Sequence, residues 1–113
     1  MTTSNPPTVS DLPGPIARAL EAYSDQLDIP AISSAYELAV EAHAGQIRAS
    51  GEEYISHPTE VATILAQLKL DSDSVIAGLI HDAVEDTWIS LEDVESRFGK
   101  SVATIVDGVT KLG

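Results

Sequence analysis

The sequence lacks cysteine and is poor in basic residues, and both shortages narrow its possible functions. Without cysteine there is no disulfide, no zinc–thiolate site and no thiol nucleophile. Six Lys and Arg residues against 18 Asp and Glu residues give a formal net charge of −12. Such a surface repels nucleic acid and anionic membranes, so we expect neither as a partner. A polyanionic substrate would need a bound cation or a locally placed arginine.

Long apolar runs are absent as well. No stretch approaches the roughly 20 apolar residues of a membrane-spanning helix. The N-terminus lacks the basic and then apolar order of a secretory signal, so we predict a cytoplasmic protein. A length of 113 residues with 43% hydrophobic residues suits one small globular domain.

Helical periodicity dominates what is present, and no window alternates with a period of two, so we predict an all-α protein. Residues 1–15 are rich in Pro, Ser and Thr and are predicted to be a flexible leader. Residues 16–113 are predicted to form the N-terminal part of one domain, because residues 107–113 look like the middle of an element. The predicted helices are about 16–27, 35–46 and 59–68, a central helix capped by residue 71 or 72 that ends at about residue 85 or 86, then 91–98 and one that begins at residue 101.

Local signals add detail to these helices. Residues 28–30 are predicted to be a break, after which Ser33 or Ser34 caps the second helix. Trp88 and Phe98 are predicted to be core anchors. The buried stripe of the third helix is predicted to consist of Val61, Ile64, Leu65 and Leu68.

The central feature is the stretch VIAGLIHDAVED at residues 75–86. At about 100° per residue, its four ionisable residues fall within roughly 140° of one helix face, and apolar residues take the rest. Such a helix lies half in a core and half over a polar site. Imidazole nitrogen and carboxylate oxygen are ligands of divalent metals. We therefore interpret this stretch, whose ionisable residues are His81, Asp82, Glu85 and Asp86, as the floor of a metal site.

The other two histidines precede this stretch in the chain. His57 comes directly before Pro58, and with the His81–Asp82 pair it makes three candidate metal ligands. A lone histidine before proline is more often a capping or core residue, and two acids at a helix end are most often solvated. His43 is left open between a residue that lines the site and a core histidine.

Three segments together resemble a known family. They are HAGQIRASGEEYISHP at residues 43–58, HDAVEDT at residues 81–87 and DGVTKL at residues 107–112. In order and spacing they resemble the N-terminal HD hydrolase domain of the RelA/SpoT (Rel) family, whose members make and degrade the alarmone (p)ppGpp. The resemblance implies a helical HD-domain fold, incomplete at its C-terminal end. A bare HD dipeptide would be weak evidence, but this ordered set is specific.

The resemblance also implies roles for individual residues. His57, His81 and Asp82 match the ligands of a manganese ion. Glu85 and Asp86 match the acids that position or activate the attacking water, as hydrolase-competent members have them. The implied reaction removes pyrophosphate from the 3′ position of guanosine tetraphosphate or pentaphosphate.

The loop between residues 47 and 57 is implied to bind the nucleotide. Arg48 is similar to the residue that packs against the guanine base, and Ser50 and Tyr54 would line the same pocket. Two departures from the family pattern stand out. Ala49 replaces a frequent second basic residue, and the family's remaining metal-ligating Asp lies beyond DGVTKL, outside these 113 residues.

Other functions remain open. One is an HD-family nucleotide phosphohydrolase with a different substrate. Another is a catalytically incomplete HD fragment that acts as a regulatory or interaction module and self-associates through the face where later helices would pack. A third is part of a bifunctional GTP pyrophosphokinase and hydrolase, although no residue here would perform the kinase reaction.

Overall fold

The computed structural model describes residues 8–44, 46 and 55–112, and every regular element in them is helical. The all-α prediction is therefore confirmed. The α-helices are α1 (Gly14–Glu21), α2 (Ile29–Ala42), α3 (Ser56–Gln67), α4 (Ser72–Asp86), α5 (Leu91–Phe98) and α6 (Lys100–Leu112). Two short 3₁₀ helices, η1 (Val9–Asp11) and η2 (Ser24–Gln26), flank α1. In this described part, no helix has the length and apolar character needed to cross a membrane.

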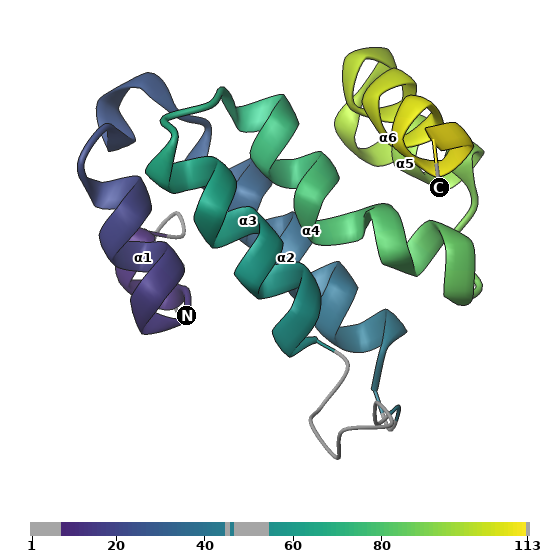
Figure 1. The fold of residues 1–113 in the computed structure, drawn as a ribbon, viewed down its shortest axis with the longest axis horizontal. Helices are drawn as coiled ribbons and strands as arrows, with labels where there is room; N and C mark the ends of the chain where they lie inside the picture. Colours follow the sequence, from purple (N-terminus) through teal and green to yellow (C-terminus); the bar gives the residue numbers. More distant parts are fainter. Residues whose placement is uncertain (1–7, 45, 47–54, 113) are drawn as a thin grey trace, which may run out of the picture.

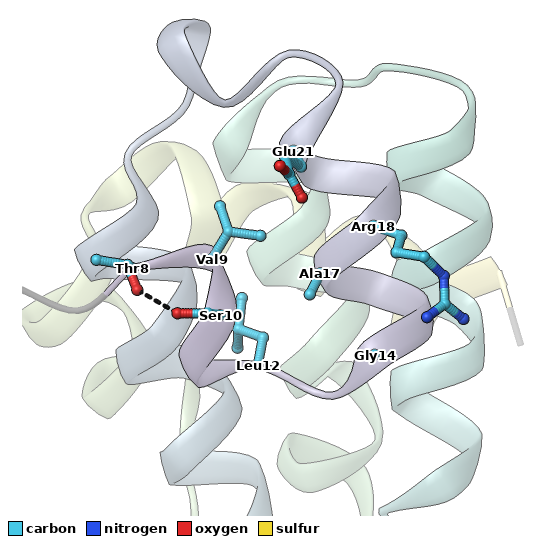
Figure 2. A pocket seen from close by; sticks show the side chains of 8 residues that line it. All are labelled: Thr8, Val9, Ser10, Leu12, Gly14, Ala17, Arg18 and Glu21. Carbon is cyan, nitrogen blue, oxygen red and sulfur yellow. Dashed lines mark hydrogen bonds between the residues drawn. The ribbon is translucent and has the colours of Figure 1, made fainter.

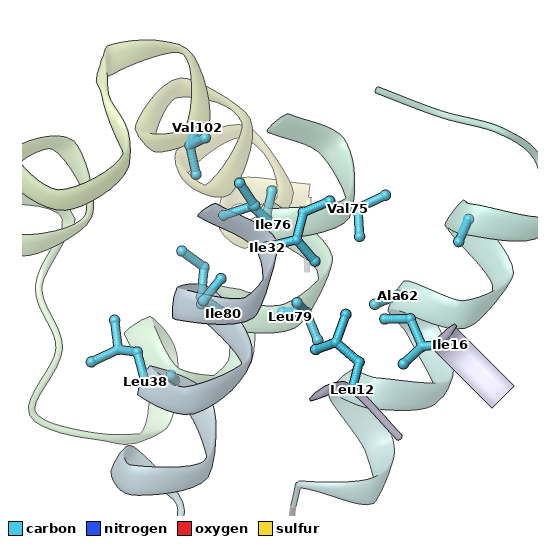
Figure 3. Close-up of a cluster of buried hydrophobic side chains, with 14 of the residues drawn as sticks. Leu12, Ile16, Ile32, Leu38, Ala62, Val75, Ile76, Leu79, Ile80 and Val102 are labelled. Carbon is cyan, nitrogen blue, oxygen red and sulfur yellow. The ribbon is translucent and has the colours of Figure 1, made fainter. Parts of the chain in front are cut away.

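Helix α4 is the centre of the fold (Figure 1). It packs against α2, α3 and α6, while α1 covers α3 and α5 covers α6. Its residues 75–80 are all buried, and Leu79 and Ile80 have no exposed surface. Figure 3 shows Leu79 and Ile80 in one buried cluster with Ile16, Ile32 and Val102, which come from three other helices. The apolar half of the central stretch thus fixes the position of the helix that carries the predicted site.

The ends of α4 follow from local sequence. The Oδ1 atom of Asp71 accepts a hydrogen bond from the backbone N–H of Ser74 at 3.0 Å, which caps the helix start. The helix ends at Asp86, and the Thr87 hydroxyl donates to the Ala83 carbonyl at 2.6 Å. The prediction, which placed the cap at Asp71 or Ser72 and the end at about residue 85 or 86, is therefore confirmed.

Helices α5 and α6 also match the prediction closely. Ser90 caps α5 through a capping box with Asp93. Gly99 ends that helix with a φ of 98°, a conformation that residues with a side chain rarely adopt. Helix α6 begins at Lys100, one residue before the predicted start.

The predicted break at residues 28–30 is wrong. Helix α2 begins at Ile29, six residues before the predicted start, and Pro30 lies in its first turn, where a missing N–H costs nothing. Asp28 caps the helix by accepting from the N–H of Ala31 at 3.1 Å. Neither Ser33 nor Ser34 is the cap, because both lie inside the helix. The helix also ends at Ala42, short of the predicted residue 46.

The predicted leader is wrong in its described part, residues 8–15. Residues 9–11 form η1, and Leu12 is only 6% exposed because it enters the core. Helix α1 begins at Gly14 and ends at Glu21, with η2 after it, where one helix over 16–27 was predicted. A single buried leucine within a Pro- and Ser-rich segment is too weak a signal to find from sequence.

Two predictions about burial are also wrong. Ile64 on α3 and Leu68 at its C-cap are 56% and 66% exposed, and the fully buried residues of the helix are instead Pro58, Ala62 and Ala66. The buried face carries small residues because α4 approaches α3 closely there. Trp88 is 58% exposed, since Ile89 beside it enters the core instead. Phe98 is partly buried against the core, as an anchor there would be.

Candidate metal site

Helices α3 and α4 bring together three of the predicted site residues. His57 lies in the first turn of α3, and His81 and Asp82 lie in the second half of α4. The Nε2 atom of His57 is 3.4 Å from Oδ2 of Asp82. The Nε2 atom of His81 is 3.1 Å from Oδ1 of the same carboxylate. Two imidazoles from different helices therefore contact the two oxygens of one carboxylate.

A backbone hydrogen bond fixes the orientation of the His81 ring. Its Nδ1 atom lies 3.1 Å from the Gly78 carbonyl oxygen. A carbonyl oxygen only accepts, so Nδ1 carries a proton and donates it. Metal-ligating histidines commonly donate their second ring N–H to a backbone carbonyl in this way, which leaves Nε2 for the metal.

The electrostatics of the pair agree with its geometry. The hydrogen bond to Asp82 raises the pKa of His81 above its ordinary value, against the opposing effect of burial. The hydrogen bond from His81 lowers the pKa of Asp82, and the charges of His81, His57 and His43 lower it further. Both shifts favour an imidazolium–carboxylate pair when no other cation faces Nε2. A divalent cation would replace the second ring proton as the positive partner of the carboxylate.

The donor set fits a divalent cation by chemical type. Two imidazole nitrogens and a carboxylate suit Mn²⁺, Fe²⁺ or Zn²⁺, without a preference from the ligands alone. Within the described ranges, however, no group of three or more His, Asp or Glu side chains is already arranged around a common point. The imidazole nitrogens are directed at the carboxylate oxygens, so binding a cation would require these side chains to reorient locally. Manganese and the three ligands accordingly remain predictions.

Glu85 and Asp86 lie one turn beyond this cluster, in the last turn of α4. Both are exposed. The charge of Glu85 contributes to the raised pKa of His81, which places it within electrostatic reach of the ring. The helix carries no basic residue in its last turn to balance the two acids. The predicted face of α4 is thus formed, whereas a catalytic role for these acids remains a prediction.

The structure of His43 agrees with both interpretations that the sequence leaves open, a core histidine and a residue that lines the site. It is 3% exposed, as a core histidine would be, and its Nδ1 atom lies 3.1 Å from Oε1 of Gln46. Its charge also lowers the pKa of Asp82, so it lies close enough to influence the cluster. The predicted nucleotide contacts Arg48, Ser50 and Tyr54 lie outside the described residues.

An apolar groove of about 340 Å³ adjoins the cluster. It lies among α3, α4 and α6, and His81 and Gly78 are on its wall together with Leu65, Ile105 and Val109. Sequence analysis did not find this groove, because it depends on how three helices pack. Sequence analysis also missed that Gly78 contributes to the site. The only sign of this in the sequence is that a glycine precedes His81 by three residues.

A second hollow lies far from these residues in the chain. It measures about 510 Å³ and is formed by η1 and α1, with Thr8, Ser10, Arg18 and Glu21 among its lining (Figure 2). None of the predicted site residues lines it. It therefore provides no support for a site at the N-terminal end of the chain.

Comparisons with known proteins match the part of the chain that contains the candidate site residues. A family model described as an HD domain matches residues 35–113. The bifunctional (p)ppGpp synthase/hydrolase SpoT of Escherichia coli K12 is 48% identical over 93 residues, which are 82% of this chain and 13% of that protein. A GTP pyrophosphokinase of Myxococcus xanthus is 45% identical over 108 residues, 96% of this chain and 13% of that protein.

A solved structure agrees with these sequence matches. It belongs to a metazoan orthologue of SpoT that hydrolyses ppGpp, and it superposes with a TM-score of 0.65 at 35% identity. The match covers 70% of this chain and 47% of that one. The chain thus spans only a small part of the curated relatives that it matches, and about half of the solved structure.

Proposed function

Because this chain belongs to the HD domain family, we propose that it acts as a guanosine-3′,5′-bis(diphosphate) 3′-pyrophosphohydrolase domain. The observation that carries the proposal is the contact of His57 and His81 with the two oxygens of Asp82. Relatives named for this hydrolase activity support the choice of substrate. One from Haemophilus influenzae is 56% identical over 75 residues, 66% of this chain and 11% of that protein.

The first part of the proposal concerns metal binding. His57, His81 and Asp82 would hold a divalent cation, for which we propose Mn²⁺. When bound, the cation would activate water as a nucleophile near neutral pH and offset negative charge at the substrate. Offsetting negative charge matters in this chain, because its formal charge of −12 opposes the approach of a polyanionic nucleotide. His81 is held for this role by its hydrogen bond to the Gly78 carbonyl.

The second part concerns proton transfer and substrate binding. Glu85 or Asp86 would accept the proton of the attacking water, whose oxygen bonds to the phosphorus attached to the 3′ oxygen. The 3′ oxygen leaves with a proton, so the products are pyrophosphate and GDP or GTP. Both acids are exposed at the end of α4, where a substrate can reach them. Arg48 would pack against the guanine base, with Ser50 and Tyr54 beside it.

The test is release of pyrophosphate from ppGpp by the 113-residue chain, with and without Mn²⁺. We expect Mn²⁺-dependent release that falls by at least about 100-fold in an Asp82→Ala variant, because a missing ligand removes both binding and activation. Asp73→Ala is the matched control, since Asp73 lies in the first turn of the same helix. Hydrolysis that survives in Asp82→Ala would refute the proposed site.

Two other results would identify the alternatives. Mn²⁺-dependent hydrolysis of other nucleotides but not of ppGpp would indicate an HD phosphohydrolase with a different substrate. Mn²⁺ binding without any hydrolysis would indicate a regulatory or interaction module that retains the metal site.

A further inference from the structure

Helices α3 and α4 lie close together at Gly78. A Cβ atom at this position would lie 2.7 Å from Cδ1 of Leu65, closer than real Cβ contacts allow. It would also lie 3.6 Å from Cγ1 of Val61 and 3.7 Å from Cα of Ala62. Ala62 and Gly78 are both buried. The absence of a side chain at residue 78 therefore leaves room for the Leu65 side chain between the two helices at their present separation.

This contact is close to the candidate metal site along both helices. Asp82 follows Gly78 by four residues on α4, and His57 precedes Ala62 by five residues on α3. At a rise of 1.5 Å per residue, these separations are only about 6–8 Å. The contact between His57 and Asp82 spans the same pair of helices at 3.4 Å. A wider separation at Gly78 would therefore lengthen the contact between those two side chains.

Gly78 also acts on the second histidine. Its carbonyl oxygen accepts the Nδ1–H of His81 at 3.1 Å. One residue thus faces α3 without a side chain and also orients the His81 ring on α4. These two effects converge on the same carboxylate, because His57 and His81 each contact one oxygen of Asp82.

We propose that Gly78 is a positioning residue for the metal site, and that it acts by letting α3 bring His57 within reach of Asp82. The proposal rests on the proposed function only in taking His57, His81 and Asp82 as ligands. Its geometric content, the dependence of the His57–Asp82 contact on the packing at Gly78, can be tested without metal or substrate.

The size of the added side chain sets the expected effect. In Gly78→Ala, the new methyl group meets the end of the Leu65 side chain, which lines the groove and can move partly into it. In Gly78→Val, the added methyl groups also press on Val61 and on the Ala62 backbone, which cannot move without shifting α3. Valine should therefore disturb the site more than alanine.

The chain provides a matched control and a matched rescue. Gly108 lies inside α6, and a Cβ atom there would meet nothing within 4 Å. Gly108→Ala therefore adds the same methyl group to a helix without a steric consequence. Leu65→Val removes the Cδ1 atom that a residue 78 methyl group would meet, so it should relieve the strain in Gly78→Ala.

Two measurements on the full chain test the proposal. The first is Mn²⁺ affinity, from the free-ion signal in electron paramagnetic resonance. We expect Gly78→Val to weaken binding about 10–100-fold, as loss of support around a metal ligand commonly does, and Gly78→Ala to weaken it roughly threefold. Gly108→Ala should bind as the parent chain does, and Leu65→Val should restore binding in Gly78→Ala. Wild-type binding of Mn²⁺ by the double variant would support the steric explanation.

The second measurement is the NMR signals of the His57 and His81 rings in metal-free protein. We expect both sets to move in Gly78→Ala and to return towards the parent positions when Leu65→Val is added. A purely structural role for Gly78 would lower thermal stability without this paired, reversible change at the rings.

The outcomes separate the two proposals. Unchanged Mn²⁺ affinity and unchanged ring signals in Gly78→Ala would overturn the positioning role, as would failure of Leu65→Val to rescue a folded Gly78→Ala. If the parent chain binds no Mn²⁺, the proposed function fails. In that case the ring signals still decide whether Gly78 controls the His57–Asp82 contact.

Discussion

The two halves of α4 are one continuous helix with opposite surroundings. Residues 75–80 are all buried and lie among α2, α3 and α6. From His81 onwards the helix carries two partly exposed ligand candidates and then two exposed acids, with only Ala83 fully buried. The first half fixes the axis and rotation of the helix, and the second half uses that fixed position to present charges. Stability and the candidate site are thus separated along one helix.

Helix α5 shows what the second half of α4 lacks. Its acids Glu92 and Asp93 lie in the first turn and Arg97 lies in the last, as the helix dipole favours. In α4 the acids Glu85 and Asp86 lie in the last turn, where the dipole opposes them, and no basic residue is there to compensate. An arrangement that opposes stability in this way is typical of a functional site.

The largest effect on stability is expected in the buried half of α4. Leu79→Ala should lower the free energy of unfolding by about 2–5 kcal/mol, because it leaves a cavity in a fully packed core. Urea unfolding followed by circular dichroism measures the change. Leu68→Ala is the control, because Leu68 is 66% exposed and its truncation should change stability by less than about 0.5 kcal/mol. Similar losses in both variants would contradict the assigned core.

A smaller effect that depends on Mn²⁺ is expected in the second half. With Mn²⁺ at about 100 times its dissociation constant, the parent chain should gain roughly 2.7 kcal/mol of stability. Asp82→Asn should abolish most of this gain, because a neutral amide is a poor replacement for a carboxylate ligand. Thermal unfolding with and without Mn²⁺ measures the gain. Asp73→Asn should retain it, and an equal gain in Asp82→Asn would remove Asp82 from the ligand set.

Sequence analysis predicted the fold best where local signals were strong. The bounds of α4 and α5 follow from their caps and their periodicity, and the prediction of both helices is confirmed. Sequence analysis failed where the packing between helices determines the start of a helix or the residues that are buried. Pro30 looked like a break but occupies a first turn, and the exposed Ile64 and Leu68 looked like core. Periodicity marks a face as apolar, but which residues meet a neighbour depends on how closely that neighbour approaches.

The candidate site, like the fold, was predicted only in part from the sequence. The resemblance to the HD hydrolase domain implied that His57, His81 and Asp82 lie together, and the structure brings them into contact. The role of Gly78 could not be predicted, because it depends on the position of Leu65 across the helix interface. The electrostatic influence of His43 on Asp82 was left open for the same reason: it depends on the packing of α2 against α4.

The smallest expected effect concerns the opposite end of α4, where an acid is favourable. Hydrogen bonds from Ser74 lower the pKa of Asp71 below its ordinary value of 3.8. The stabilising contribution of Asp71 is therefore fully present above that value and is lost as pH falls through the lower, folded-state pKa. Asp71→Ala should cost about 1 kcal/mol near neutral pH, since it removes an N-cap, and progressively less at acidic pH.

Urea unfolding across this pH range, with Asp71→Asn as the control, separates the cap from the charge. Asparagine retains a side-chain oxygen that accepts from the Ser74 N–H, but it cannot titrate. The stability difference between Asp71→Asn and Asp71→Ala should therefore hardly depend on pH. The difference between the parent chain and Asp71→Asn should vanish in acid. A parent chain that keeps its full advantage over both variants in acid would show that the Asp71 charge contributes nothing to the start of α4, and the contrast between the two ends of this helix would then rest on Glu85 and Asp86 alone.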